Sequence, residues 1–254
     1  MPRTFRLFIS STFNDLKEER NALQQVVFPR LRDLCNEHGY RFQPIDLRWG
    51  ISAEASLNQK TMRICLEELH RCQETTPTPN FLILLGNRYG WQPLPETLTV
   101  DEFQSIINVN LTDEEQNTLK QWYKIDENAV PTIYELQPRT GDYTDYNTWS
   151  IIENQLRQIL SKSKTVKENL DKSATEHEII NGLLQTKNSN EHVFCFLREF
   201  ELDKPIDRII ADRPKESEIF FDTKNENNAL VSNSSLQLQL QNLKNKIREA
   251  IPNN

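Results

Sequence analysis

Apolar runs and helical spacing alternate along the first 86 residues of the chain. Apolar positions recur at near-helical spacing from Ser11 towards Cys35 and again over residues 59–73, which predicts two helices. Each helix lies between short apolar runs that are typical of strands. Strands and helices that alternate with short connections indicate right-handed βαβ crossovers and an α/β architecture with a parallel sheet. The predicted strands cover residues 4–10, 40–47 and 80–86.

The alternation stops after the third predicted strand. Residues 88–172 contain no comparable apolar run, so we expect a helical insertion over the ligand face or a helical lobe. Regularity returns with a predicted helix over residues 173–184 and a predicted strand over residues 192–200. The helical patterns of the insertion occupy residues 100–109, 112–124 and 148–160.

The last part of the chain changes in composition. A short final strand is predicted at residues 218–222, and the Asn- and Ser-rich residues 223–235 are typical of a loop or linker. Residues 236–251 have the spacing of a terminal helix that packs on the body or leads into a following module. The expected organisation is an α/β domain over residues 1–222, an insertion within it at about 92–172, and a linker and helix over 223–254.

Composition and charge exclude several classes of function. A net charge of −7 argues against broad binding to a nucleic-acid backbone, which needs a basic face. The apolar runs are too short to span a bilayer, and the first residues do not resemble a signal peptide. Four cysteines without a CxxC pair are typical of reduced, buried thiols. We therefore expect a cytoplasmic protein with no membrane partner and no direct nucleic-acid partner.

Familiar cofactor motifs are missing from the sequence. It contains neither the GxxxxGK[ST] phosphate loop nor the GxGxxG dinucleotide fingerprint. Its four histidines are scattered and do not pair at a metal-ligand spacing, so we expect no metal site and no bound cofactor.

Three polar clusters follow predicted strands, and the carboxyl ends of parallel strands are where α/β sheets bind ligands. They are Ser10-Ser11-Thr12, Asp46 to Gly50, and Gly86 to Trp91. The second and third each place a guanidinium beside an aromatic ring, a pair suited to a flat, anionic ligand. The predicted substrate-binding residues are Ser10, Ser11, Asp46, Arg48, Trp49, Arg88, Tyr89 and Trp91.

Structural roles are an alternative for the first two clusters. Asp46 and Arg48 are also suited to a local ion pair, with Trp49 in the core. Ser10 and Ser11 are also suited to capping the helix that follows them. Pro29 lies inside that helix, so a kink is expected just before it.

Two glutamates occur near the start of the helix predicted after the insertion. Glu176 is placed to complete a capping box with Ser173. Glu178 precedes two isoleucines and is expected to be half-buried, which suits a catalytic carboxylate. The two point about 200° apart on a helix, so only one is expected to serve a given pocket.

Several ordered motifs resemble one protein family over residues 3–200. The resemblance is to the TIR-like domain at the amino terminus of STAND-type NTPases, which include NACHT and WD-repeat, telomerase-associated and nephrocystin-like proteins and bacterial antiphage relatives. The motifs are RLFISSTFNDLxxER (6–20), IDLRWGI (45–51), ICL (64–66), LLGNRYGW (84–91), WYxxDENAVP (122–131), YxLxPR (134–139) and SxTExEI (173–179).

This resemblance implies a flavodoxin-like (TIR-like) parallel sheet flanked by helices, with a helical insertion after the third strand. It places residues 46–54 at the position of the TIR BB loop. Glu178 before Ile179 matches the local pattern of the catalytic glutamate in TIR domains that cleave NAD, although some eighty residues intervene after the third strand. NAD is then the substrate, and the carboxylate of Glu178 is expected to bind its ribose hydroxyls.

Two classes of function remain open. The first is an effector of defence or innate immunity that cleaves NAD when it oligomerises. The second is a non-catalytic module for homotypic assembly, in which Arg48 and Trp49 anchor an interface. Both imply self-association and C-terminal NTPase and sensor modules in a longer chain.

Overall fold

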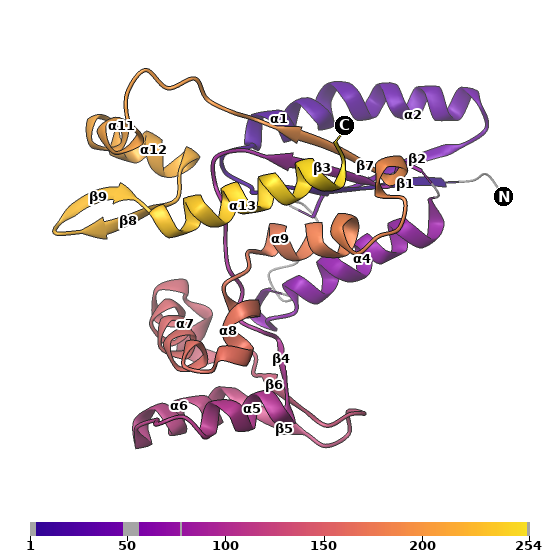
Figure 1. Ribbon diagram of the computed structural model, residues 1–254. Helices are drawn as coiled ribbons and strands as arrows, with labels where there is room; N and C mark the ends of the chain where they lie inside the picture. The colour runs from indigo at the N-terminus through magenta and orange to yellow at the C-terminus, as the bar shows by residue number, and fades with distance from the viewer. Residues whose placement is uncertain (1–3, 48–55, 77, 253–254) are drawn as a thin grey trace. The chain divides into compact units, whose positions relative to one another are not determined.

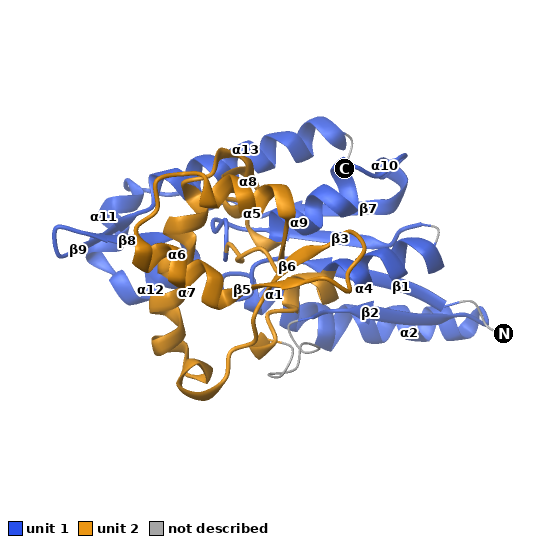
Figure 2. Cartoon of the chain, turned by 90° about the horizontal axis from the view of Figure 1, so that it is seen from below, with its two compact units in different colours: residues 1–50, 66–91, 175–254 blue, residues 51–65, 92–174 orange. Residues whose placement is uncertain are grey.

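The computed structural model describes residues 4–47, 56–76 and 78–252. The chain divides into two compact units, which Figure 2 colours separately. Unit 1 comprises residues 1–50, 66–91 and 175–254, and unit 2 comprises residues 51–65 and 92–174.

Unit 1 is built on a parallel four-stranded sheet (Figure 1). Its order, β2-β1-β3-β7, places the first strand in the interior and the last at an edge. All five residues of β3 are buried, as its continuous apolar run predicts. The α/β class, the parallel sheet and the flanking helices are therefore confirmed, and they fit a flavodoxin-like fold. The strands are β1 (Thr4–Ser10), β2 (Arg41–Ile45), β3 (Phe81–Leu85) and β7 (Val193–Leu197).

The first helical segment covers one face of this sheet. It consists of α1 (Lys17–Ala22), a π-helical turn (Leu23–Val27) and α2 (Phe28–Glu37). The π-helical turn ends immediately before the turn that holds Pro29, where a kink was expected. Apolar side chains of these helices pack on Ile9, Leu82 and Leu84 of the sheet.

Three later helices of the chain lie on the other face of the sheet. They are α4 (Thr61–Thr75), α9 (Ala174–Ile179) with a π-helical continuation (Ile180–Leu184), and α13 (Ser234–Ala250). Figure 1 shows α4 and α9 on the side of the sheet opposite α1 and α2.

The insertion forms the core of unit 2 and contains strands that the sequence did not predict. Two of its helices begin with capping boxes, Thr99 with Glu102 and Thr112 with Glu115, which explains why their starts are well marked in the sequence. The strands are only three or four residues long and form an antiparallel sheet of order β4-β6-β5. The elements are β4 (Thr97–Thr99), α5 (Val100–Ile107), α6 (Asp113–Trp122), β5 (Tyr123–Asp126), β6 (Ile133–Leu136), a 3-10 turn (Gly141–Thr144), α7 (Tyr146–Ser161) and α8 (Lys164–Leu170).

The C-terminal segment is more ordered than its composition suggests. The strand predicted at residues 218–222 is wrong, because α12 continues to Phe220. A β-hairpin occupies most of the stretch expected to be a linker, with its turn at the positive-φ residues Asn227 and Asn228. The elements are α10 (Ser189–His192), α11 (Ile206–Asp212), α12 (Pro214–Phe220), β8 (Thr223–Glu226), β9 (Ala229–Ser232) and α13.

Candidate functional site

The carboxylate of Glu178 lies at the carboxyl end of β1. Ser10, the last residue of that strand, donates a hydrogen bond from Oγ to Glu178 Oε2 over 2.5 Å. Ser10 is fully buried and Glu178 is 8% exposed. The sheet edge predicted to bind ligand therefore holds a buried, hydrogen-bonded glutamate from α9.

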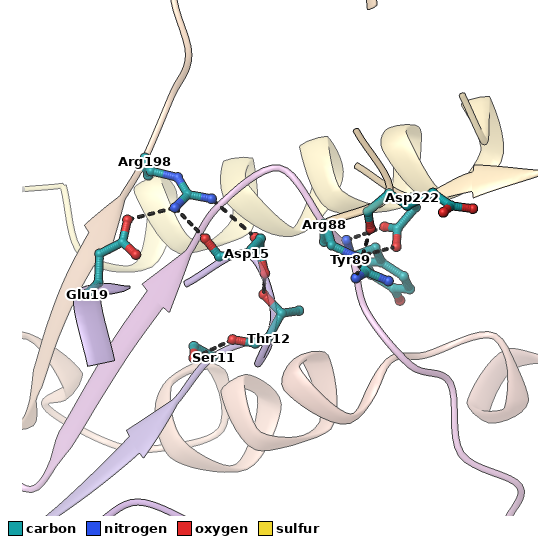
Figure 3. Close-up of polar contacts among 9 residues, drawn as sticks. Ser11, Thr12, Asp15, Glu19, Arg88, Tyr89, Arg198 and Asp222 are labelled. Atoms are coloured by element: carbon teal, nitrogen blue, oxygen red, sulfur yellow. Dashed lines mark hydrogen bonds and ion pairs between the residues drawn. The ribbon is translucent and has the colours of Figure 1, made fainter. Parts of the chain in front are cut away.

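Ser10 and Ser11 do not cap α1, so that alternative is wrong. The helix begins at Lys17 with no side-chain cap. Ser11 Oγ instead donates to the carbonyl oxygen of Thr12, and Thr12 Oγ1 donates to the carboxylate of Asp15 (Figure 3). The hydroxyls stabilise the turn between β1 and α1 rather than the helix start.

Glu176 holds the phenol of Tyr89. The Tyr89 hydroxyl donates to Glu176 Oε2, and Lys246 of α13 lies 3.4 Å from Glu176 Oε1. Glu176 is therefore buried in a polar network, in addition to any role at the start of its helix. Both glutamates of α9 contact predicted site residues, Glu176 through Tyr89 and Glu178 through Ser10.

The loop after β3 is also bound to the carboxylate of Asp222. The backbone N–H of Tyr89 donates to Asp222 Oδ2 over 2.5 Å, and Arg88 Nε lies 3.2 Å from Asp222 Oδ1. Arg88 Nη1 also donates to the carbonyl oxygen of Glu218. Figure 3 shows the guanidinium and the amide directed at one carboxylate.

Two glycines let the loop after β3 approach the turn after β1. Gly90 has a φ of +96°, and a Cβ there would lie 2.7 Å from Thr12 Cγ2. A Cβ on Gly86 would overlap the carboxylate of Asp15 and the guanidinium of Arg198. A side chain at either position would displace its neighbours, and at Gly90 it would also be strained by the positive φ.

Arg198, the residue after β7, joins that strand to α1. Its Nη1 donates to the carbonyl oxygen of Asp15 over 2.5 Å and lies 2.6 Å from Glu19 Oε1. Burial raises the pKa of Asp15, against the lowering effects of the hydrogen bond from Thr12 and the charge of Arg198. This network fixes the turn that follows Ser10.

Asp46 forms a buried ion pair with Arg20 of α1. Arg20 Nη1 lies 2.9 Å from Asp46 Oδ1, with the two side chains 1% and 3% exposed. Arg20 Nη2 also donates to the carbonyl oxygen of Ile9, and Gln24 Nε2 donates to Asp46 Oδ2. The Arg20–Asp46 contact ties α1 to the ends of β1 and β2.

Three predicted residues remain, Arg48, Trp49 and Trp91. Arg48 and Trp49 are outside the described residues. Trp91 is 51% exposed, so its indole is available to a ligand or to another protein. Ser10, Tyr89 and Glu178 belong to the hydrogen-bonded groups at the sheet edge.

The comparison with known families places part of this site in a recognised domain. Residues 6–130 match the family model described as "Domain of unknown function (DUF4062)". This part of the chain is similar to DUF4062 domains. That match includes Ser10, Arg88 and Tyr89, whereas Glu178 and Asp222 lie beyond it.

The curated relatives that the chain matches are much longer proteins. "NACHT and WD repeat domain-containing protein 2" of Mus musculus is 37% identical over 139 residues, which make up 54% of this chain and 8% of the relative. "NACHT domain- and WD repeat-containing protein 1" of Mus musculus is 30% identical over 193 residues, 72% of this chain and 12% of the relative. "Telomerase protein component 1" of Rattus norvegicus is 40% identical over 91 residues, 36% of this chain and 3% of the relative.

The chain is therefore similar to a part of NACHT and WD-repeat proteins, as the sequence motifs indicated. The chain spans about a tenth of the length of those NACHT relatives. No solved structure matches the chain significantly.

A cavity of about 320 Å³ lies in unit 2, and none of its lining residues is a predicted site residue. Trp122 and Pro138 belong to two of the motifs that carried the family resemblance. The lining residues are Gln121, Trp122, Lys124, Gln137, Pro138, Thr140 and Tyr143.

Over residues 4–47, 56–76 and 78–252, no group of three His, Cys, Asp or Glu side chains is placed to hold a metal ion. Over the same ranges, no helix is both long and apolar enough to cross a bilayer.

Sequence reasoning missed Asp222, Lys246 and Arg198 as residues of this region. They come from segments more than 100 residues after β3 and had no motif to mark them. Glu176 could be noticed in the sequence because it lies two residues before Glu178. A capping role at the start of the helix accounted for its presence equally well.

Proposed function

We propose that unit 1 is a TIR-like effector domain that cleaves NAD, with Glu178 as its catalytic glutamate. The observation that supports this most is the buried Glu178 carboxylate, held by Ser10 at the carboxyl edge of a parallel sheet. A π-helical turn begins two residues later at Ile180, and such turns are frequent at functional sites.

The proposed reaction breaks the bond between nicotinamide and C1′ of its ribose. Nicotinamide leaves with the bonding electron pair, and water adds to the ribose carbon. The Glu178 carboxylate binds the ribose hydroxyls and stabilises the positive charge that develops on the ring. Ser10 positions that carboxylate through its hydrogen bond.

Aromatic and basic groups near this edge suit the remainder of the dinucleotide. The half-exposed indole of Trp91 offers a stacking surface, and Trp49 is the second candidate ring. Arg88 and Arg48 are the candidate partners of the pyrophosphate. Ser11 and Asp46 contribute to the shape of the edge rather than to ligand contacts, because their polar atoms bind other protein groups.

We propose that activity is coupled to assembly in a longer cytoplasmic protein. The matched relatives are named for NACHT and WD-repeat regions, so an NTPase and a sensor are the expected C-terminal modules. Clustering of the chains would favour the conformation that binds NAD, as a shift between existing states. The biological role would be signalling in antiviral defence or innate immunity.

The test is NAD consumption by the protein at its natural length, under conditions in which it assembles. Glu178→Ala should abolish NAD loss while the circular-dichroism spectrum stays unchanged. Glu168→Gln is the matched control, because that glutamate lies in α8 with an 86% exposed side chain. An assembled wild type that leaves NAD untouched rules out this function.

A second candidate, homotypic assembly, is favoured by the exposed edge strand β7. Phe194 and Phe196 are 51% and 63% exposed and align with Leu82 and Leu84 of β3. In a parallel sheet, aligned residues share a face. Both rings therefore lie on the face that α1 and α2 cover at β3, but they remain exposed at the edge strand. Exposed edges that carry apolar side chains are templates for pairing with another chain.

A mass measurement tests whether β7 is an assembly interface. If a second copy binds at β7, Phe194→Glu with Phe196→Glu should reduce the assembled mass found by light scattering. Ile151→Glu in α7 is the control, because that side chain is also highly exposed. Equal masses for wild type and the double variant would exclude β7 as the interface.

A further inference from the structure

We propose that the Arg88 guanidinium and the Tyr89 amide form an oxyanion-binding site, and that Asp222 occupies it as an intramolecular substitute for the ligand. The proposal rests on the proposed function only for the identity of the ligand, the pyrophosphate of a dinucleotide. The site itself follows from contacts within unit 1.

Both donors bind the same carboxylate. The Tyr89 amide lies 2.5 Å from Asp222 Oδ2, and Arg88 Nε lies 3.2 Å from Asp222 Oδ1. The Asp222 side chain is 7% exposed, whereas that of Arg88 is 25% exposed. A ligand approaching from solvent can therefore reach the guanidinium, but the carboxylate fills the position between the two donors.

This pair of donors is chemically suited to phosphate. A guanidinium and a backbone amide directed at one point are the groups that proteins use for carboxylate and phosphate oxygens. The donors follow β3 at the carboxyl edge of a parallel sheet, where ligands of α/β folds bind. Each phosphate of a dinucleotide pyrophosphate carries one negative charge, as the Asp222 carboxylate does, and its oxygens accept hydrogen bonds from the same kinds of donor.

The C-terminal segment restrains the same loop at a second point. Lys246 of α13 lies 3.4 Å from Glu176, which accepts the hydrogen bond from the Tyr89 hydroxyl. The amide and the phenol of Tyr89 are thus both tied to elements after residue 175. A movement of α12 and α13 that withdraws Asp222 would expose the donors, so a module following in a longer chain would control the site through this segment.

Asp222 also has a defined place in the backbone of that segment. It lies between α12 and β8, and its carbonyl oxygen accepts a hydrogen bond from the Asn233 amide over 2.9 Å. That contact does not involve the side chain. The Asp222 carboxylate can therefore be removed by substitution while the hairpin that follows keeps its backbone pairing.

The test is calorimetric binding of inorganic pyrophosphate to the whole chain, without turnover. Asp222→Ser should bind at least tenfold more tightly than wild type, because the competing carboxylate is gone. Asp212→Ser is the matched control, since it removes the same charge from the same segment but pairs with Lys204. Adding Arg88→Ala to Asp222→Ser should abolish the gain.

Other outcomes also decide the proposal. If Asp222→Ser does not fold, Asp222→Asn removes the charge while its side-chain oxygen still accepts the Tyr89 amide, and it should show a smaller gain. Equal affinity in Asp222→Ser and Asp212→Ser, or a gain that survives Arg88→Ala, overturns the proposal. Pyrophosphate binding without NAD cleavage would reject the proposed function and leave this site standing.

Discussion

Ser10 Oγ and Glu178 Oε2 lie 2.5 Å apart, although their residues are separated by 168 positions in the chain. The contact joins the end of an interior strand to the helix that follows the insertion. Because both residues are buried, the hydrogen bond contributes to stability as well as to the placement of the carboxylate.

Replacing Ser10 with alanine removes the donor and leaves the carboxylate without that partner. We expect the free energy of unfolding to fall by about 1.5–3 kcal/mol, the range for a hydrogen bond to a charged group. Urea denaturation measures the change. Ser150→Ala, which removes an exposed hydroxyl bonded to the Asn147 carbonyl in α7, should change it much less.

The Arg20–Asp46 ion pair predicts strong coupling between two substitutions. Asp46→Ala or Arg20→Ala removes one member of this buried ion pair, and either should reduce stability by about 3–5 kcal/mol. The double variant should lose much less than the sum of the two. Additive losses in a double-mutant cycle would show that the pair does not act as a unit. The exposed pair Arg213–Glu216 is the control.

Gly90→Ala should destabilise the loop that carries Tyr89. A Cβ at φ +96° is strained and would also press on Thr12 Cγ2. We expect a loss of about 1–3 kcal/mol in the free energy of unfolding. Gly39→Ala is a useful comparison, because Gly39 also has a positive φ but has nothing within 4 Å of its Cβ position. A loss no larger than that of Gly39→Ala would show that the Thr12 contact has no cost.

Burial makes two cysteines unreactive in the folded chain. It raises the pKa of Cys72 to about 11 and that of Cys195 to about 12. At pH 8 about one Cys72 thiol in a thousand is ionised, so a disulfide reagent should modify both cysteines much faster in urea than in the folded state. Fast modification of both thiols in the native chain would contradict this.

The raised pKa of Cys72 determines how the free energy of unfolding changes with pH. The unfolded thiols ionise at their ordinary pKa near 9, whereas the folded Cys72 thiol keeps its proton to about pH 11. Over that interval the unfolded state binds fewer protons, so the free energy of unfolding should fall as pH rises from about 9 to 11. Cys72→Ala should weaken this dependence, as measured by urea denaturation at several pH values.

The main sheet was predictable because each strand leaves a local pattern. The continuous apolar run of β3 and the βαβ rhythm before it depend only on nearby residues. They were sufficient to predict a parallel sheet and to place Ser10 and Tyr89 at its carboxyl edge. The strands β4, β5 and β6 are too short to produce a comparable pattern, so the insertion was expected to be helical.

The partners of the site residues were much harder to predict. Asp46 binds Arg20, whose position in α1 gives no sign that the side chain is buried. Asp222 reaches the loop after β3 from the residues that follow α12, and Lys246 of α13 contacts Glu176, which accepts the hydrogen bond from Tyr89. Only the folded chain brings these residues together. Pairings of this kind depend on sheet order and helix placement, which a local sequence pattern does not contain.

The most direct test of Glu178 as the catalytic residue is nicotinamide release from NAD by the assembled protein, with Glu178→Gln beside wild type. Glutamine keeps the size of the side chain and an oxygen that accepts the Ser10 hydroxyl, but it removes the negative charge. We expect wild type and Glu168→Gln to release nicotinamide and Glu178→Gln to lose that activity with an unchanged melting temperature. Release by Glu178→Gln at the wild-type rate, or none by assembled wild type, would contradict that role.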